Sequence, residues 1–197
     1  YSLGRGESII LDLEDHYVGQ FSIDIDSVGS PMDAPLYLRL KFAAGPSELY
    51  ARSEDYEGWL SRSWIQEEYL HLDTLPTTLQ LPRRYSCRYV ELTVIDTSPK
   101  WQASFSSPKF IAKSSVSMAQ VPTMTIEDNT LKAIYDVSVK TLLDCMQTVF
   151  EDGPKRDRRL WLGDLRLQAL ANYYTFNDLS LVKRCLYLFG GMRTNEG

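Results

Sequence analysis

Cysteine and histidine are scarce in this chain of 197 residues, which contains three cysteines and two histidines. Cys87, Cys145 and Cys185 lie far apart and form neither a zinc-type spacing nor a disulfide framework. We therefore expect buried free thiols, no metal and no cofactor. His16 and His71 have no metal-binding or nucleophilic partner in the sequence, so surface or strand positions are expected for both.

Other absences exclude further classes of protein. No run approaches the ~18 apolar residues that suggest a membrane-spanning helix, and the first residues lack the order of a signal peptide. The formal charge is −5 without a basic stretch for duplex binding, so neither a membrane nor a nucleic acid is an expected partner. Gly-rich phosphate loops and nucleophile elbows are missing too. The sequence leaves localisation, cytoplasmic or exported, open. Because it does not begin with Met, we expect a longer parent protein.

The first part of the chain alternates between apolar and polar residues up to about Ser115. Phe21, Ile23 and Ile25 place every second side chain on one face. Similar alternations occupy residues 8–14, 36–42, 89–94 and 109–113, with Gly and Pro turns between them. Short alternating strands at this spacing are typical of an antiparallel sandwich. The pattern predicts a β-sandwich domain, jelly-roll-like, over residues 1–118.

Near Pro122 the period becomes helical. Thr125 and Asp128 resemble a capping box at the start of the first helix. A second helix is predicted to start at Asp164, and a third to run from about Asn177 or Asp178 to the pair of glycines at 190–191. The apolar residues at helical spacing are Leu131, Ile134, Tyr135, Leu142, Cys145 and Met146 in the first helix, and Leu167, Leu170, Ala171 and Tyr174 in the second.

Three helices enclose only a small core. We therefore expect residues 119–197 to be the start of a larger all-α domain that is truncated in this chain. A half-built helical domain should expose apolar faces, through which the chain could self-associate.

The segment between the first two helices, residues 151–164, concentrates charge. It contains four carboxylates, four basic residues and Trp161, and Gly153 and Pro154 interrupt any continuous helix. By composition alone a solvated charged loop accounts for it. The same mixture suits glycosidic cleavage, which needs one protonated carboxyl to protonate the leaving oxygen and further carboxylates near the sugar.

Two parts of this segment carry a resemblance. Residues 152–157, Asp-Gly-Pro-Lys-Arg-Asp, and residues 160–164, Leu-Trp-Leu-Gly-Asp, resemble the signature of α-L-rhamnosidases of glycoside hydrolase family seventy-eight. In that family the loop reads approximately Asp-Cys-Pro-x-Arg-(Asp/Glu), followed by a Trp and Gly-Asp. Family members carry β-sandwich domains before an (α/α)6 six-hairpin barrel, and the loop lies between the first helices of that barrel. The resemblance therefore implies the same architecture here.

By position, the resemblance implies that Asp157 is the general acid. It further implies that Asp152, Arg156, Trp161 and Asp164 bind the sugar. Two departures stand out: Gly153 replaces the usual Cys, and Arg158 occupies the place that holds the general acid in members reading Arg-Asp-Glu. Either Asp157 protonates the leaving group with a shorter reach, or the loop has lost its acid.

The family inverts configuration, with a general base on a later barrel helix. The resemblance thus implies hydrolysis of terminal α-L-rhamnose or a related sugar from an oligosaccharide or glycoside, and it implies that this chain alone is inactive. Two alternatives remain. One is a non-catalytic carbohydrate-binding module with Trp59, Trp64 and Tyr69 as platforms, and the other is a degenerate structural relative.

Overall fold

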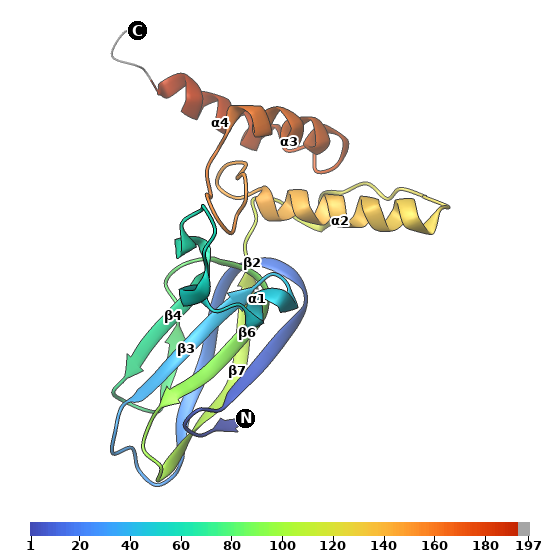
Figure 1. Ribbon diagram of the computed structural model, residues 1–197. Helices are drawn as coiled ribbons and strands as arrows, with labels where there is room; N and C mark the ends of the chain where they lie inside the picture. Colours follow the sequence, from blue (N-terminus) through green and yellow to red (C-terminus); the bar gives the residue numbers. More distant parts are fainter. Residues whose placement is uncertain (193–197) are drawn as a thin grey trace. The chain divides into compact units, whose positions relative to one another are not determined.

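The computed structural model describes residues 1–192, apart from the side chain of Ser63. The chain divides into two units, residues 1–112 and a second unit that begins at Lys113. The first unit is built of strands and the second of helices (Figure 1). Within the described part of the chain, every helix is too short or too polar to cross a membrane.

Seven strands form the first unit, and every pairing between them is antiparallel. They are β1 (Ser2–Leu3), β2 (Ser8–Gly29), β3 (Leu36–Ala43), β4 (Gln66–Leu72), β5 (Thr77–Gln80), β6 (Tyr85–Asp96) and β7 (Trp101–Ala112). Their order in the sheet is β1-β7-β2-β6-β3-β4, with β5 paired to β2. The connection from β3 to β4 carries a short helix α1 (Pro46–Tyr50) and two 3-10 turns, η1 (Ser53–Asp55) and η2 (Arg62–Trp64).

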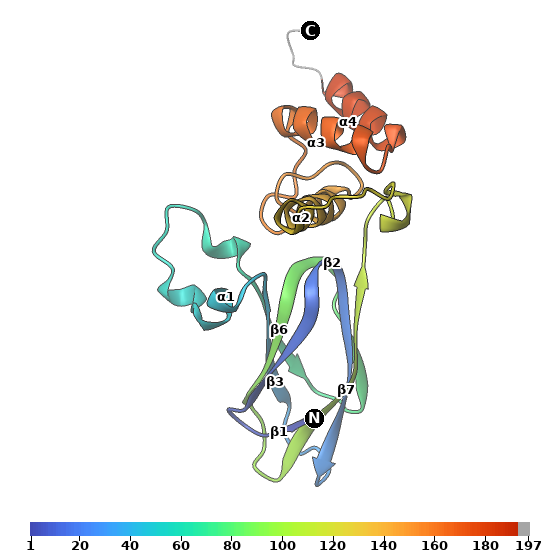
Figure 2. The ribbon, with the colours of Figure 1, turned by 90° about the vertical axis from the view of Figure 1, so that its right-hand side faces the viewer.

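The long strand β2 joins the two layers of the sandwich. Its residues 8–19 pair with β6, whereas residues 19–29 pair with β7 and residues 22–25 also pair with β5. The register shifts between Asp12 and Tyr17, and Glu14 in that interval has a φ of 69°. Such an irregularity bends a strand and increases its twist. One layer therefore contains β6, β3 and β4, and the other contains β7, β1 and β5 (Figure 2).

The alternation predicted from the sequence is the alternation of burial in the structure. Phe21, Ile23 and Ile25 are at most 2% exposed. Leu36, Leu38, Leu40, Phe42, Val90, Leu92 and Val94 are buried with them in one core. Each such side chain contributes roughly 1.5–3 kcal/mol when it leaves water. The predicted sandwich is confirmed.

The second unit contains the 3-10 turn η3 (Met118–Gln120) and the helices α2 (Asn129–Cys145), α3 (Leu162–Tyr174) and α4 (Leu179–Gly191). The capping box predicted at Thr125 is wrong, because Asp128 itself is the N-cap of α2 and accepts from the amides of Thr130 and Leu131. The predicted start of α3 at Asp164 is also wrong, since the helix begins at Leu162. The predicted start and end of α4 are confirmed, with Asp178 as its N-cap.

A small core holds these helices together. It consists of Val139, Leu142, Met146, Phe150, Leu165, Ala169, Phe176, Leu181, Val182 and Cys185. Several apolar residues that the sequence placed at helical spacing along one side of the first and second helices are exposed, namely Leu131 (58%), Ile134 (58%), Leu167 (67%), Leu170 (53%) and Tyr174 (76%). Three helices cannot enclose all of their apolar faces, so the expected exposure is observed.

Cysteine and histidine occupy structural positions. The three cysteines are free thiols, with Cys87 and Cys185 buried and Cys145 partly buried. His16 lies in β2, where its Nε2 is 3.1 Å from the hydroxyl of Ser86. His71 lies in β4 and stacks on Tyr37, with ring centroids 4.2 Å apart.

Candidate functional site

The loop from residue 151 to residue 161, called the acidic loop below, is closed at its base by the backbone. Asp152 and Arg159 form an isolated antiparallel bridge, in which the amide of Asp152 donates to the carbonyl of Arg159 over 2.8 Å. The amide of Glu151 donates to Cys145 at the end of α2. The segment between the two bridged residues is therefore a tight turn attached to the helical core, and not a loosely solvated excursion.

Left-handed backbone makes this turn possible. Gly153 has a φ of 62° and Arg158 a φ of 52°. The carbonyl of Gly153 accepts from the amides of Arg156 and Arg158, and Arg158 Nε donates to the carbonyl of Pro154 over 3.1 Å. A Cβ at position 153 would meet no atom within 4 Å. Glycine is therefore favoured there by conformation and not by space.

Asp157 and Arg156, the predicted acid and its neighbour, form an ion pair on this turn. Arg156 Nε lies 3.2 Å from Asp157 Oδ1, and Arg156 Nη2 lies 3.4 Å from Asp157 Oδ2. Their side chains are 43% and 33% exposed, respectively, so the pair is accessible to a ligand. A guanidinium facing both oxygens of a carboxyl group limits the orientations of that group.

Trp161 and Asp164 lie at the start of α3. Trp161 is the N-cap residue, is 44% exposed, and makes no side-chain capping hydrogen bond. Asp164 is exposed in the first turn, where the helix dipole favours a negative charge. An indole and a carboxylate therefore stand within one helical turn of each other, where the acidic loop ends and α3 begins. This is a combination that can stack on a sugar ring and accept from its hydroxyl groups.

One residue outside the predicted set, Gln168, supports the loop. Gln168 in α3 donates its Nε2 to the carbonyl of Glu151 over 3.1 Å, and the Glu151 side chain is buried. The only cue to Gln168 in the sequence is its place one helical turn after Asp164. Gln168 therefore ties α3 to the base of the acidic loop.

The thiol of Cys145 lies beside the base of the loop but is chemically quiet. Burial, together with the negative charges of Asp144, Glu151 and Asp152, raises the pKa of Cys145 to about 11. A thiol with such a pKa stays protonated near neutral pH and is a poor nucleophile. Asp152 therefore lies with Asp144 and Glu151 near Cys145, at the end of α2. Among residues 1–192, no group of three or more His, Cys, Asp and Glu side chains is arranged to hold a metal ion.

Comparison with known proteins assigns both units to one class. Residues 1–112 match the N-terminal domain of glycosyl hydrolase family 78 alpha-rhamnosidases, and residues 119–197 match the bacterial alpha-L-rhamnosidase 6 hairpin glycosidase domain. The chain thus combines the sandwich and the first helices of a six-hairpin glycosidase. It belongs to glycoside hydrolase family 78, the α-L-rhamnosidases.

Solved structures agree with this assignment. A rhamnosidase from Klebsiella oxytoca with rhamnose bound is 49% identical, with a TM-score of 0.91 over 97% of this chain. The family 78 rhamnosidase of Bacillus sp. GL1 (23% identity, TM-score 0.74) and the α-L-rhamnosidase from Dictyoglumus thermophilum (16%, 0.61) share the fold over 94% of the chain. The chain spans 37%, 18% and 20% of these three proteins, respectively. No curated protein matches it.

Proposed function

We propose that the protein to which this chain contributes hydrolyses terminal α-L-rhamnose, or a related sugar, with Asp157 as the general acid. The proposal is carried by the Arg156–Asp157 ion pair, which a turn closed by the Asp152–Arg159 bridge presents to solvent. Family membership supports the reaction class. The Klebsiella oxytoca rhamnosidase, solved with rhamnose bound, supports the sugar.

The other residues of the site have binding roles in this proposal. Asp152 and Asp164 accept hydrogen bonds from sugar hydroxyls, Arg156 orients the acid, and the indole of Trp161 forms a wall against the apolar face of the sugar. All of them lie in the proposed catalytic domain, residues 119–197, so residues 1–118 are proposed to be an accessory sandwich domain.

The proposed reaction is a single displacement that inverts the anomeric centre. Asp157 gives its proton to the glycosidic oxygen as the bond to the anomeric carbon breaks. A general base takes a proton from the water that attacks the opposite face of the sugar, which requires the two carboxyl groups to be about 6.5–9.5 Å apart. We propose that this base lies outside the 197 residues of this chain, and that the chain alone is therefore inactive.

The test compares Asp157→Asn with Lys155→Ala in the longer protein. Loss of a general acid typically costs about 10²–10⁴-fold in turnover, whereas Lys155→Ala removes a neighbouring charge from the same turn and should cost far less. The loss in Asp157→Asn should shrink on an aryl rhamnoside with a good leaving group, because such a leaving group departs without protonation. Equal losses in the two variants would remove Asp157 from the acid role. Rhamnosidase turnover by the 197-residue chain alone would contradict the assignment of the base to another segment.

A further inference from the structure

The outer face of β3 and β4 carries a paired set of aromatic and charged side chains. Across these strands Tyr37 faces His71, Arg39 faces Tyr69, and Lys41 faces Glu67. They alternate with the buried residues of β3, so they point away from the core. We call the part of this face formed by Tyr37, Arg39, Tyr69 and His71 the Tyr69 shelf.

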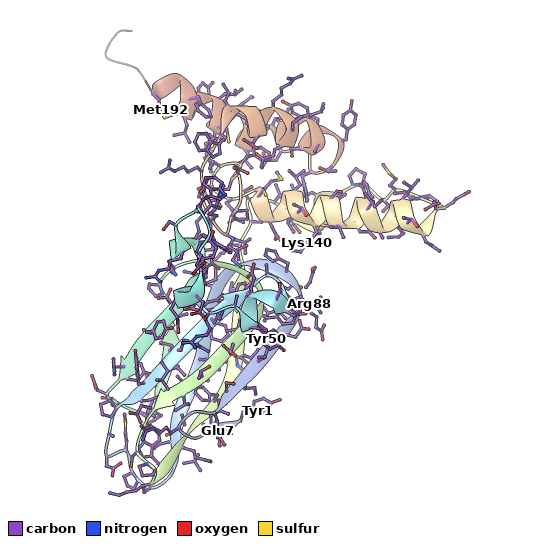
Figure 3. All side chains as sticks on the ribbon, viewed as in Figure 1. Tyr1, Glu7, Tyr50, Arg88, Lys140 and Met192 are labelled. Atoms are coloured by element: carbon purple, nitrogen blue, oxygen red, sulfur yellow. The ribbon has the colours of Figure 1, made fainter. Side chains whose placement is uncertain are left out.

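One end of the shelf is bounded by the connection between β3 and β4. Lys41 and Glu67 belong to the outer face, yet their side chains are only 4% and 8% exposed, and their charged groups lie 3.4 Å apart. Lys41 Nζ donates to the carbonyls of Leu49 and Ala51, and the hydroxyl of Ser53 donates to Glu67 over 2.8 Å. These contacts hold the connection down on the sheet, where it forms a fixed wall beside Tyr69. The exposed Tyr50 marks this segment in Figure 3.

The open part of the shelf is a row of rings. Tyr69 and Tyr37 have ring centroids 6.4 Å apart at 44°, and Tyr37 and His71 stack at 4.2 Å with their planes 3° apart. Tyr69 is 48% exposed at the walled end of the row. Rings held by neighbours on both strands lose little freedom when a ligand binds, which favours affinity.

Polar groups surround the exposed ring. Arg39 is held by Glu91 over 2.8 Å and by Thr93 over 3.2 Å, and its Nε has no hydrogen-bond partner among the described residues. The hydroxyl of Tyr69 donates to Glu67 over 3.3 Å. Burial raises the pKa of Tyr69, and the charge of Glu67 adds to this effect, so the hydroxyl stays a neutral donor at physiological pH. An aromatic face next to an arginine and two carboxylates fits a ring with both C–H and hydroxyl surfaces.

We propose that the Tyr69 shelf is a second, non-catalytic binding surface for a neutral pyranose ring of the glycan. The C–H face of the sugar packs on Tyr69, and a hydroxyl group of the sugar reaches the guanidinium of Arg39, whose side chain is 29% exposed. The class of ligand rests on the proposed function, because a protein acting on rhamnosides meets such rings. The shelf lies in the sandwich and shares no residue with the acidic loop.

The test titrates the 197-residue chain with methyl α-L-rhamnopyranoside and methyl β-D-glucopyranoside, followed by ligand-observed saturation-transfer NMR. Tyr69→Ala should weaken binding by about fivefold or more, whereas Tyr69→Phe, which keeps the ring, should bind within about twofold of the parent. Tyr174→Ala is the matched control, because it removes an even more exposed tyrosine from α3. Asp157→Asn separates binding at the shelf from binding at the acidic loop.

Each outcome of these titrations either supports the proposal or overturns it. Binding that Tyr69→Ala weakens, and that Tyr174→Ala and Asp157→Asn leave unchanged, supports the shelf. Equal binding of both pyranosides at the shelf also supports the proposal, because it names a neutral pyranose and not rhamnose alone. The shelf can therefore fail or stand independently of the proposed rhamnosidase activity. Absence of pyranose binding, binding lost only in Asp157→Asn, or a shelf that captures only protein partners would overturn the proposal.

Discussion

The side chain of Asn172 in α3 is hydrogen-bonded to Asp178, the N-cap of α4, and its removal gives a sharp test of the helical unit. Asn172 is fully buried. Its Nδ2 donates to the carbonyl of Asp178 over 3.1 Å, and its Oδ1 accepts from the amide of Asp178 over 3.0 Å. Its own carbonyl accepts from Thr175 and Asn177. The Asn172 side chain thus provides a hydrogen-bond partner for both the amide and the carbonyl of Asp178, where the chain reverses between the helices.

Asn172→Ala leaves the amide and the carbonyl of Asp178 without these partners. A buried polar group left unsatisfied costs about 1–3 kcal/mol. Asp178 is only partly buried, so water can recover some of this loss. We therefore expect a decrease of about 2 kcal/mol in the free energy of unfolding of this unit, which corresponds to roughly 8–16 °C in Tm for a domain of this size.

The assay is urea and thermal unfolding followed by far-UV circular dichroism at the helical minimum, because all long helices of the described chain lie in the second unit. Asn129→Ala is the matched control: it makes the same change at the exposed first residue of α2 and should alter stability by no more than about 0.5 kcal/mol. A loss for Asn172→Ala as small as that of the control would refute the assigned role of the side chain.

Two further predictions concern a helix cap and a turn. Burial would by itself raise the pKa of Asp178, but hydrogen bonds from Ser180 and Leu181 reverse this, and the net pKa is lowered. A lowered folded-state pKa means that the cap stabilises above the unfolded pKa of about 3.9 and that this stability is lost as the pH falls through the folded-state pKa. Asp178→Asn should therefore reduce the pH dependence of the free energy of unfolding across that acidic range, as measured by urea unfolding. An unchanged pH dependence would contradict the capping role of the Asp178 carboxylate. Gly153→Ala should destabilise by about 1 kcal/mol because of its left-handed backbone. Gly163→Ala, in helical backbone with open space, should be neutral or stabilising by up to about 1 kcal/mol in the same assay.

The sandwich was predictable from the sequence because its periodicity is the physical cause of its burial. Alternate residues of a strand point to opposite faces, so the run from Leu36 to Phe42 indicates both a strand and its inner side. The outer face was not predictable in the same way. A lysine at position 41 reads as solvent-exposed, yet Lys41 is 3% exposed, because the β3–β4 connection covers it and Glu67 neutralises it.

The helices were predictable in number but less so in their packing. Leu131 and Leu167 lie at helical spacing on the apolar sides of their helices, and both are exposed. Periodicity shows which side of a helix is apolar and does not show whether a partner covers it. The start of α3 was missed because Trp161, which is not a usual capping residue, occupies the N-cap.

The contrast between positions 157 and 158 bears most directly on the proposed chemistry. In family members reading Arg-Asp-Glu, the residue corresponding to Arg158 is the acid. Here Arg158 adopts left-handed backbone, and its Nε donates back to Pro154 within the same turn. Position 158 therefore helps to close the turn, while the neighbouring carboxyl at 157 is oriented by Arg156 and is accessible. With arginine at position 158, the proton donor must lie elsewhere on the turn or be lost, and the carboxyl at position 157 gives this turn an oriented, accessible candidate for the first alternative.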